Sequence, residues 1–270
     1  MGWSDSAGVS VKYVVEGEGT SLVLIHEMGG SRHSWRPFVE RLPMGLRALR
    51  YDLRGAGDSE KVRAPFTMDD HVTDLEAVLA DAEQAGPHVV VGCAAGAGIA
   101  LRYAEKHPEN TLGVVLCSPA LSVSAERQKY IADRAALCAA EGMRAVAEDT
   151  LSRSYPAVVR RDVAVYENYR GNFMAQDPVG FGLINMAFAH ASAFAGSAVL
   201  ELGSRVQCPC LVLAGKHDGL RPEAEVRKVA DRIPGARFAV IDSAHVPGTQ
   251  APEELAAFIT EFVHQCEAKR

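Results

Sequence analysis

The 270-residue sequence has no long apolar run, no excess of positive charge and no basic leader segment. No apolar stretch approaches the roughly 18 residues that a membrane-spanning helix needs. Lysine and arginine number 28 against 34 aspartate and glutamate residues, and the net charge of −6 argues against nucleic acid or an anionic membrane as a partner. Residues 1–5 contain no basic segment leading into an apolar core. We therefore expect no signal peptide and a cytoplasmic protein.

The six cysteines lack the spacing of a metal site or of a redox motif. Cys208 and Cys210 are separated by a single proline, which fits neither a zinc site nor a C-x-x-C pair. Cys93 and Cys117 lie in or beside apolar segments, where a free thiol behaves as a small core residue. We expect reduced, structural cysteines, no metal and no cofactor.

What the sequence does contain is a strand, a tight turn and a helix over residues 89–101, V-V-V-G-C-A-A-G-A-G-I-A-L. Three consecutive valines predict a strand buried on both faces. Gly92 and Gly96 stand two residues on either side of Ala94, which has the form of the G-x-S-x-G elbow. Glycine is needed there because the central residue sits on a strained turn, pressed against neighbouring backbone. The pattern is typical of a serine hydrolase, with alanine in place of the nucleophilic serine.

Segments typical of strands alternate with segments typical of helices along most of the chain. Because such alternation requires a mainly parallel sheet with helices on both faces, we predict an α/β fold. We expect strands at residues 9–15, 22–25, 46–51, 89–91, 114–117, 211–214 and 238–241. We expect helices at residues 35–42, 68–79, 99–103, 223–230 and 252–263.

The alternation stops between residues 121 and 205, where the sequence becomes rich in alanine and arginine and mostly helical. This shift marks an insertion. We predict a core of residues 1–120 and 206–270, with a helical cap formed by residues 121–205.

Together these segments resemble the α/β-hydrolase family, and the resemblance covers essentially the whole chain. Five motifs occur in the order and at the spacing of that family: L-V-L-I-H-E-M-G-G-S (22–31), Y-D-L-R-G-A-G-D-S (51–59), G-C-A-A-G (92–96), L-V-L-A-G-K-H-D (211–218) and D-S-A-H-V-P (242–247). Among its branches the chain is most similar to the 3-oxoadipate enol-lactonase and small carboxylesterase group. Residues 177–181, D-P-V-G-F, are similar to the D-P-x-G-Y stretch of that group.

The resemblance implies a catalytic triad in the chain order nucleophile, acid, histidine. It places Ala94 at the nucleophile position, Asp218 as the acid and His245 as the base. The imidazole would take a hydroxyl proton while the carboxylate fixes its tautomer. The alternatives are that Asp218 only begins a loop and that His245 is a core histidine. His217 is a competing base, although a residue adjacent to the acid cannot easily face across the cleft.

The resemblance also implies an oxyanion hole formed by the backbone N–H groups of Met28 and Ala95. Glu27 occupies the place of a glycine that the family has in this loop. Glycine readily adopts a positive φ and glutamate does not, so the sequence does not determine the backbone geometry of this loop. We expect the side chain of Glu27 to point to the surface, with a carboxylate in the cleft as the alternative. His26 and Arg54 are interpreted as residues that brace loops.

Alanine at position 94 has several interpretations. It is the substitution that an experimenter introduces to trap a substrate, and it also fits natural loss of the nucleophile. Direct attack by a water that His245 activates could replace the covalent step. A lyase or dioxygenase on this fold is a separate alternative, since a fold does not fix the chemistry. Cys93 should point into the core and is a poor substitute. A non-catalytic binder of a small ligand is a further alternative, and a short-chain dehydrogenase is disfavoured because Tyr103 and Lys106 have the wrong spacing.

The resemblance implies a small ester or lactone as the substrate, and a substrate carboxylate would suit the arginines of the insertion. Candidate contacts are Glu27 and, from the insertion, Arg153, Arg160, Arg161, Arg170, Met174, Phe181, Met186, Phe188 and Phe194. Arginine is also common on solvated helix faces, and the apolar residues could simply pack the cap on the core. The sequence carries no signal for the oligomeric state.

Overall fold

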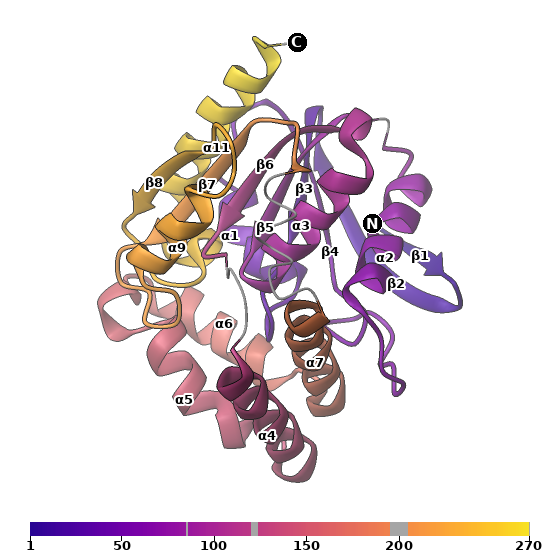
Figure 1. Ribbon diagram of the computed structural model, residues 1–270, viewed down its shortest axis with the longest axis vertical. Helices are drawn as coiled ribbons and strands as arrows, with labels where there is room; N and C mark the ends of the chain where they lie inside the picture. Colours follow the sequence, from indigo (N-terminus) through magenta and orange to yellow (C-terminus); the bar gives the residue numbers. More distant parts are fainter. Residues whose placement is uncertain (85, 120–123, 195–204, 270) are drawn as a thin grey trace.

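A single eight-stranded sheet organises the chain in the computed structural model, which describes residues 1–84, 86–119, 124–194 and 205–269 (Figure 1). The strand order is β1-β2-β4-β3-β5-β6-β7-β8. Strands β3 to β8 pair in parallel, whereas β2 pairs antiparallel with both β1 and β4. The strands are β1 (Gly2–Ser6), β2 (Val9–Gly17), β3 (Gly19–Ile25), β4 (Gly45–Tyr51), β5 (His88–Cys93), β6 (Thr111–Cys117), β7 (Cys210–Gly215) and β8 (Arg237–Ile241). The predicted α/β-hydrolase fold is confirmed.

Apolar residues on both faces of the central strands explain why the sheet is buried on both sides. In β5, Val90 packs into one core cluster while Val89 and Val91 pack into the other, because successive side chains of a strand point to opposite faces. Every residue of β5 is buried. This strand leads directly into the turn at Ala94, so the turn starts from a rigid part of the core.

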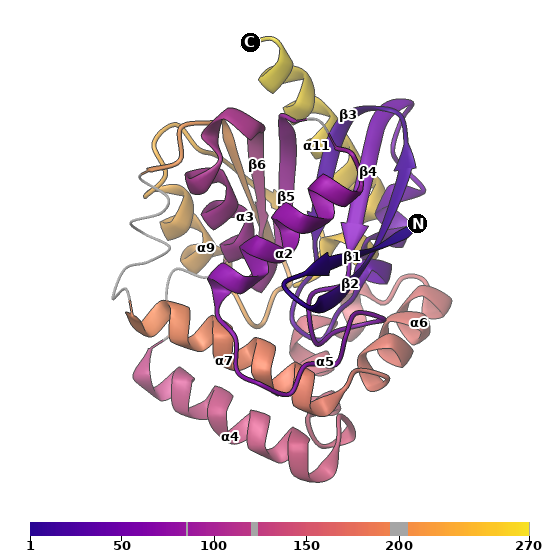
Figure 2. The same ribbon diagram turned by 90° about the vertical axis from the view of Figure 1, so that its right-hand side faces the viewer.

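Helices cover both faces of the sheet, as the two core clusters require. Helices α2, α3 and α9 pack on one face, and α1 and α11 pack on the other (Figures 1 and 2). The bounds are α1 (Arg36–Val39), α2 (Met68–Asp81), α3 (Ala95–Lys106), α9 (Glu223–Ala230), α10 (Pro247–Gln250) and α11 (Pro252–Glu267). Short 3-10 helices lie at η1 (Arg32–Trp35), η2 (Pro108–Asn110) and η3 (Ala157–Val159). None of the described helices has both the length and the apolar character that a bilayer crossing requires.

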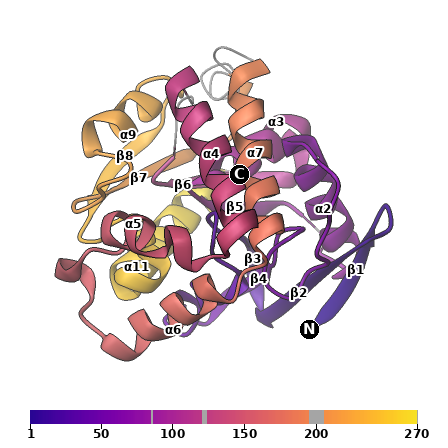
Figure 3. The same cartoon turned by 90° about the horizontal axis from the view of Figure 1, so that it is seen from below.

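Four helices between β6 and β7 lie beneath the carboxyl ends of the parallel strands. They are α4 (Ala125–Glu141), α5 (Arg144–Ser154), α6 (Val163–Met174) and α7 (Pro178–Phe194). Helices α4 and α7 run side by side, and Figure 3 shows all four from below. The division into a core (1–120 and 206–270) and a cap (121–205) stays a prediction, and residues 121–123 and 195–204 of that cap lie outside the described residues.

Strand β1 is an edge strand that the sequence analysis missed. Its inward-facing residues are Ser4 and Ser6, both buried, while Trp3 is exposed. The usual alternation of apolar and polar residues is therefore reversed in this segment. A pattern search for apolar alternation finds no strand there.

His26 and Arg54 brace the loops that leave β3 and β4. The Leu53 N–H donates to Nε2 of His26 (3.0 Å), and the opposite ring nitrogen donates to the Glu27 carbonyl (2.7 Å). Since a carbonyl only accepts and an N–H only donates, this pairing fixes which ring nitrogen carries the proton. Arg54 forms a two-pronged ion pair with the buried Asp74 carboxylate of α2, at 2.7 and 2.6 Å.

Replacing Arg54 with methionine should destabilise the fold, because Asp74 would keep a buried charge without its partner. The expected loss in the free energy of unfolding is about 3–5 kcal/mol. The matched control is Arg63→Met, which breaks the exposed ion pair with Asp177 and should cost less than about 1 kcal/mol. Urea denaturation of both variants measures the difference. Equal losses in the two variants would show that Arg54 does not brace the loop.

Candidate active site

The turn between β5 and α3 holds Ala94 in a conformation that L-residues rarely adopt, with φ 51° and ψ −109°. The Ala94 N–H donates to the Cys117 carbonyl of β6 at 2.9 Å. The flanking glycines permit close backbone approach: a Cβ on Gly92 would lie 2.2 Å from the Gly96 carbonyl oxygen, and one on Gly96 would lie 2.4 Å from that of Ile25. The turn therefore has the backbone of a nucleophile elbow, and its central residue faces the pocket described below.

Asp218 and His245 come together at the carboxyl ends of β7 and β8. Nδ1 of His245 lies 2.8 Å from Oδ2 of Asp218, and both residues are buried. The other carboxylate oxygen accepts the Leu220 and Arg221 N–H groups at 2.8 and 2.9 Å. Burial alone would raise the pKa of Asp218, but the attraction and hydrogen bond of His245 and the backbone N–H of Arg221 lower it below its ordinary value. Asp218 is thus held as an anion beside the imidazole.

Gln250, which the sequence analysis missed, fixes the position of the histidine loop. Its side-chain oxygen accepts the N–H groups of Ala244 and Val246 at 2.7 and 3.2 Å. Its amide nitrogen donates to the Ser154 carbonyl at 2.8 Å, and the His245 N–H donates to the same carbonyl at 3.2 Å. The imidazole is therefore tied to α5 as well as to Asp218. Within the described chain, its Nε2 makes no hydrogen bond.

Met28 and Ala95, whose backbone N–H groups are predicted to form the oxyanion hole, line the same pocket as Ala94. Ala95 is the first residue of α3, where helical N–H groups have no intrahelical acceptor. Neither N–H donates to another residue in the part of the chain that the structure describes. Both donors are free to bind an oxygen of a ligand in this pocket.

Glu27 is buried and lines the pocket, so the expectation that it points to the surface is wrong. Its Oε1 accepts hydrogen bonds from the hydroxyls of Ser34 (2.8 Å) and Tyr169 (3.0 Å). Its Oε2 is buried without a partner among the described residues. Gly30 makes room for the carboxylate, because a Cβ there would lie 2.0 Å from Oε1. Glu27 takes no positive φ, so the loop avoids the strain that glutamate would otherwise impose.

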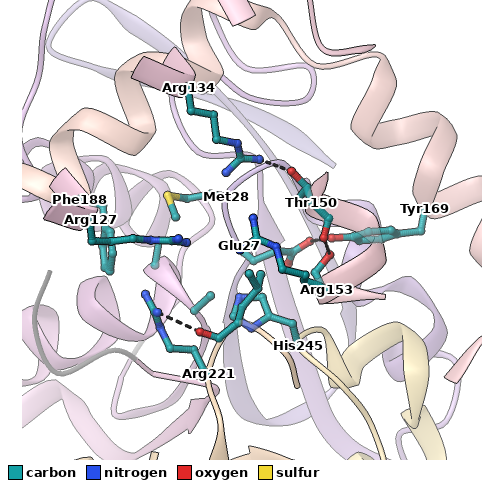
Figure 4. Close-up of a pocket in the computed structure, with 14 residues that line it drawn as sticks. Glu27, Met28, Arg127, Arg134, Thr150, Arg153, Tyr169, Phe188, Arg221 and His245 are labelled. Atoms are coloured by element: carbon teal, nitrogen blue, oxygen red, sulfur yellow. Dashed lines mark hydrogen bonds between the residues drawn. The ribbon is translucent and has the colours of Figure 1, made fainter. Parts of the chain in front are cut away.

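The pocket lies between the sheet and the helices beneath it (Figure 4). About 660 Å³ around its lining is free of protein atoms, solvent at the mouth included. The enclosed cavity itself is about 50 Å³, which is smaller than the roughly 300–1,000 Å³ of small-molecule sites. The lining consists of Glu27, Met28, Ala94, Ala95, Arg127, Arg134, Thr150, Arg153, Ser154, Tyr169, Phe188, Leu220, Arg221 and His245. Among the described residues, no cluster of histidine, cysteine, aspartate or glutamate is placed to hold a metal ion.

Of the described candidate contacts from the insertion, the structure brings Arg153 and Phe188 to the pocket lining and leaves the others outside it. The side chain of Phe194 lies outside what the structure describes. Arg160 lies over the ring of Tyr166 and donates to the Tyr155 carbonyl. Phe181 packs on Phe173, 5.9 Å between ring centroids. Met186 packs against the apolar cluster that contains Ala95, Ile131 and Phe188. Arg161 pairs with Asp242, and Arg170 with Glu167.

The alternative catalytic residues, Cys93 and His217, are not among the residues that line the pocket. Cys93 is buried in the core, and burial, together with the nearby charge of Glu27, raises the pKa of its thiol well above the ordinary value. A thiol held protonated is a poor nucleophile. His217 pairs with Asp242 at 2.9 Å and does not line the pocket.

Arg127, Arg134, Thr150, Tyr169 and Arg221 line the pocket but were not singled out from the sequence. Arg127 and Arg134 are seven residues apart, which puts them on one face of α4. That spacing is visible in the sequence. Which face meets the core depends on how α4 packs against α7, and the sequence alone does not reveal it.

Comparison with known proteins places the chain among hydrolases. The model of the Hydrolase_4 family, serine aminopeptidase S33, matches residues 19–245. A poly(3-hydroxyalkanoate) depolymerase from Ectopseudomonas oleovorans is 26% identical over 91% of this chain and 85% of its own. Two solved structures are 25% identical: a malate-bound thermophilic esterase from Thermogutta terrifontis (TM-score 0.89, covering 98% and 97% of the two chains) and the enol-lactonase from Burkholderia xenovorans LB400 (0.88, 97% and 100%).

Asp218 should make stability depend on pH in the acid range. Because its folded-state pKa is lowered, its contribution is present above the ordinary value of 3.8 and is lost as pH falls toward the lowered value. In Asp218→Asn the amide would direct an N–H group toward existing N–H donors, at a cost of about 1–3 kcal/mol at neutral pH.

Urea unfolding between neutral pH and about pH 3 measures this contribution. Asp218→Asn should lose less stability on acidification than the unmodified protein. Asp133→Asn, which removes an exposed carboxylate paired with Lys129, should instead follow the unmodified curve. Parallel curves for Asp218→Asn and the unmodified protein would contradict the assignment.

Proposed function

The chain belongs to the serine aminopeptidase S33 family of α/β-hydrolases, and on that premise we propose that its site is built to hydrolyse a small carboxylic ester or lactone. The reaction requires a serine at position 94, where this sequence has alanine. The esterase and enol-lactonase among the similar structures support this substrate class. The proposed residues are Ala94 at the nucleophile position, Asp218 and His245, with no cofactor.

The observation that carries the proposal is the convergence of the elbow and the histidine–aspartate pair on one pocket. Nδ1 of His245 is engaged by Asp218 at 2.8 Å, so Nε2 is the ring nitrogen available to a hydroxyl. His245 and Ala94 both line the pocket. A general base oriented by a buried carboxylate, next to an elbow, is the geometry that nucleophilic acyl transfer needs.

The remaining groups supply the other parts of the reaction. A serine hydroxyl at position 94 passes its proton to Nε2 of His245 as its oxygen attacks the carbonyl carbon. The N–H groups of Met28 and Ala95 stabilise the negative charge that develops on the carbonyl oxygen. Asp218 stabilises the imidazolium, which then protonates the leaving alkoxide. Water repeats the sequence and releases the acid.

The strain at Ala94 supports serine as the working residue. A non-glycine residue in such a conformation costs on the order of 1–3 kcal/mol, and functional sites are where that cost is usually retained. With alanine the strained turn presents only a methyl group, which has no chemistry. We therefore interpret Ala94 as a serine-to-alanine change in an otherwise complete site, introduced or natural.

Ala94→Ser tests the proposal directly. The change adds one oxygen, and we expect it to confer hydrolysis of small esters and lactones and labelling by a fluorophosphonate. Removing the serine of a triad typically lowers turnover by on the order of 10⁶, so restoring it should raise turnover by several orders of magnitude. Turnover of an ester panel and intact-mass spectrometry measure the two effects. Ala94→Ser combined with His245→Gln is the matched control and should remain unlabelled.

The other outcomes decide between the alternatives. A folded Ala94→Ser protein that is unlabelled and inactive would refute the hydrolase and favour a ligand-binding protein. Turnover by the unmodified protein that Ala94→Ser does not increase would indicate chemistry driven by His245 without a covalent intermediate.

A further inference from the structure

Four arginines line the pocket that contains Ala94 and His245. Arg127 and Arg134 come from α4, Arg153 from α5 and Arg221 from the loop that follows β7. Figure 4 shows Arg134 reaching into the pocket from one side and Arg221 from the opposite side, with Arg127 between them. Of the 14 described lining residues, Glu27 is the one acid. The pocket therefore carries a surplus of positive charge in a protein whose net charge is −6.

Three of these arginines have no acidic partner among the described residues. Arg153 pairs with Asp149, but no carboxylate of the described residues lies within ion-pair distance of Arg127, Arg134 or Arg221. The Nε atoms of Arg127 and Arg134 are buried and make no hydrogen bond to the described part of the chain. These unpaired N–H donors indicate a ligand that accepts hydrogen bonds from them.

Neutral groups hold two of the arginines in place without neutralising them. The guanidinium of Arg127 lies 4.6 Å from the centroid of the Tyr130 ring. That of Arg134 lies 5.0 Å from the Phe181 ring and donates to the Thr150 hydroxyl. Phe181 thus contributes by supporting Arg134 and not by lining the pocket. The guanidinium planes are oriented, and their charges stay available.

Mutual repulsion makes this arrangement costly in the free protein. Burial lowers the pKa of Arg221, and the neighbouring charge of Arg127 lowers it further. Burial likewise lowers the pKa of Arg134. Buried charges of one sign are destabilising unless an opposite charge is present. An anionic ligand that bridges the guanidinium groups removes that cost.

We propose that Arg127, Arg134 and Arg221 bind a carboxylate of the substrate, whose ester or lactone carbonyl then lies at Ala94. Guanidinium groups fit a carboxylate through paired N–H donors, which gives both attraction and orientation. Figure 4 shows Glu27 beside Tyr169, on the opposite side of the pocket from Arg127, where it repels the same carboxylate. The substrate class is therefore a half-ester of a dicarboxylic acid, or a lactone that carries a free carboxylate. The ester part of this inference rests on the proposed function, whereas the carboxylate part rests on the arginines.

Calorimetric titration of the unmodified protein measures binding itself, and the serine that the proposed hydrolysis requires is absent from position 94. The probes are monomethyl glutarate, which carries one carboxylate, and dimethyl glutarate, which carries none. We expect the half-ester to bind at least about tenfold more tightly than the diester. Rising salt should weaken binding of the half-ester more than that of the diester.

Arg134→Gln and Arg221→Gln should each weaken half-ester binding about tenfold and leave diester binding nearly unchanged. The matched control is Arg170→Gln, which removes an exposed arginine of α6 outside the pocket and should change neither affinity. Thermal unfolding of each variant checks that it is folded. The comparison of the two esters on the unmodified protein needs no variant.

Equal affinity of the unmodified protein for the two esters would overturn the inference. Tighter binding of inorganic phosphate than of the half-ester would also overturn it, since the arginines would then form a phosphate site. Ala94→Ser separates this inference from the proposed function. Hydrolysis of both esters without a carboxylate preference would refute the inference alone. A carboxylate preference in binding, with no hydrolysis by Ala94→Ser, would refute the function alone.

Discussion

The close contact between the elbow and strand β3 is the constraint on which the pocket depends. Gly96 lies against the Ile25 carbonyl so tightly that a Cβ would fall 2.4 Å from that oxygen. The contact brings the start of α3 against the loop that leaves β3, so that Ala95 and Met28 border one pocket. The Ala94 N–H bond to β6 holds the turn from the other side. The two proposed oxyanion donors and the proposed nucleophile position are thus placed by backbone packing, which side-chain changes disturb little.

The insertion contributes to the site through backbone contacts as well as through its arginines. The Ser154 carbonyl at the end of α5 accepts hydrogen bonds from both His245 and Gln250. Arg153, the preceding residue, lines the pocket. A displacement of α5 would therefore move the imidazole and this guanidinium together. The proposed base and one part of the proposed ligand site are coupled through a single carbonyl group.

The sequence predicts what depends on local pattern and chain order, and misses what depends on packing between distant segments. Strand β5 and the turn at Ala94 are predicted by runs of adjacent residues, the valines and the flanking glycines. Asp218 and His245 are predicted to meet because each follows one of two neighbouring parallel strands. Strand β1 was missed because its inward residues are serines. Glu27 was expected at the surface because its partner Tyr169 is 142 residues away in the sequence. Whether the face of α4 that carries Arg127 and Arg134 is turned toward the pocket depends on how α4 packs against α7.

The arginines that line the pocket offset the negative charge of Glu27. A carboxylate close to a developing oxyanion opposes it, since like charges repel strongly where water is excluded. The hydroxyls of Ser34 and Tyr169 hold Glu27 through Oε1, and Gly30 leaves the space that this position requires. Four arginines against one glutamate keep the described lining positive. In our proposal the pocket therefore favours both a substrate carboxylate and the charge of the intermediate. Glutamate at position 27 is thus compatible with the proposed acyl transfer because the arginines offset its charge, and losing several of them would impair that chemistry as well as binding.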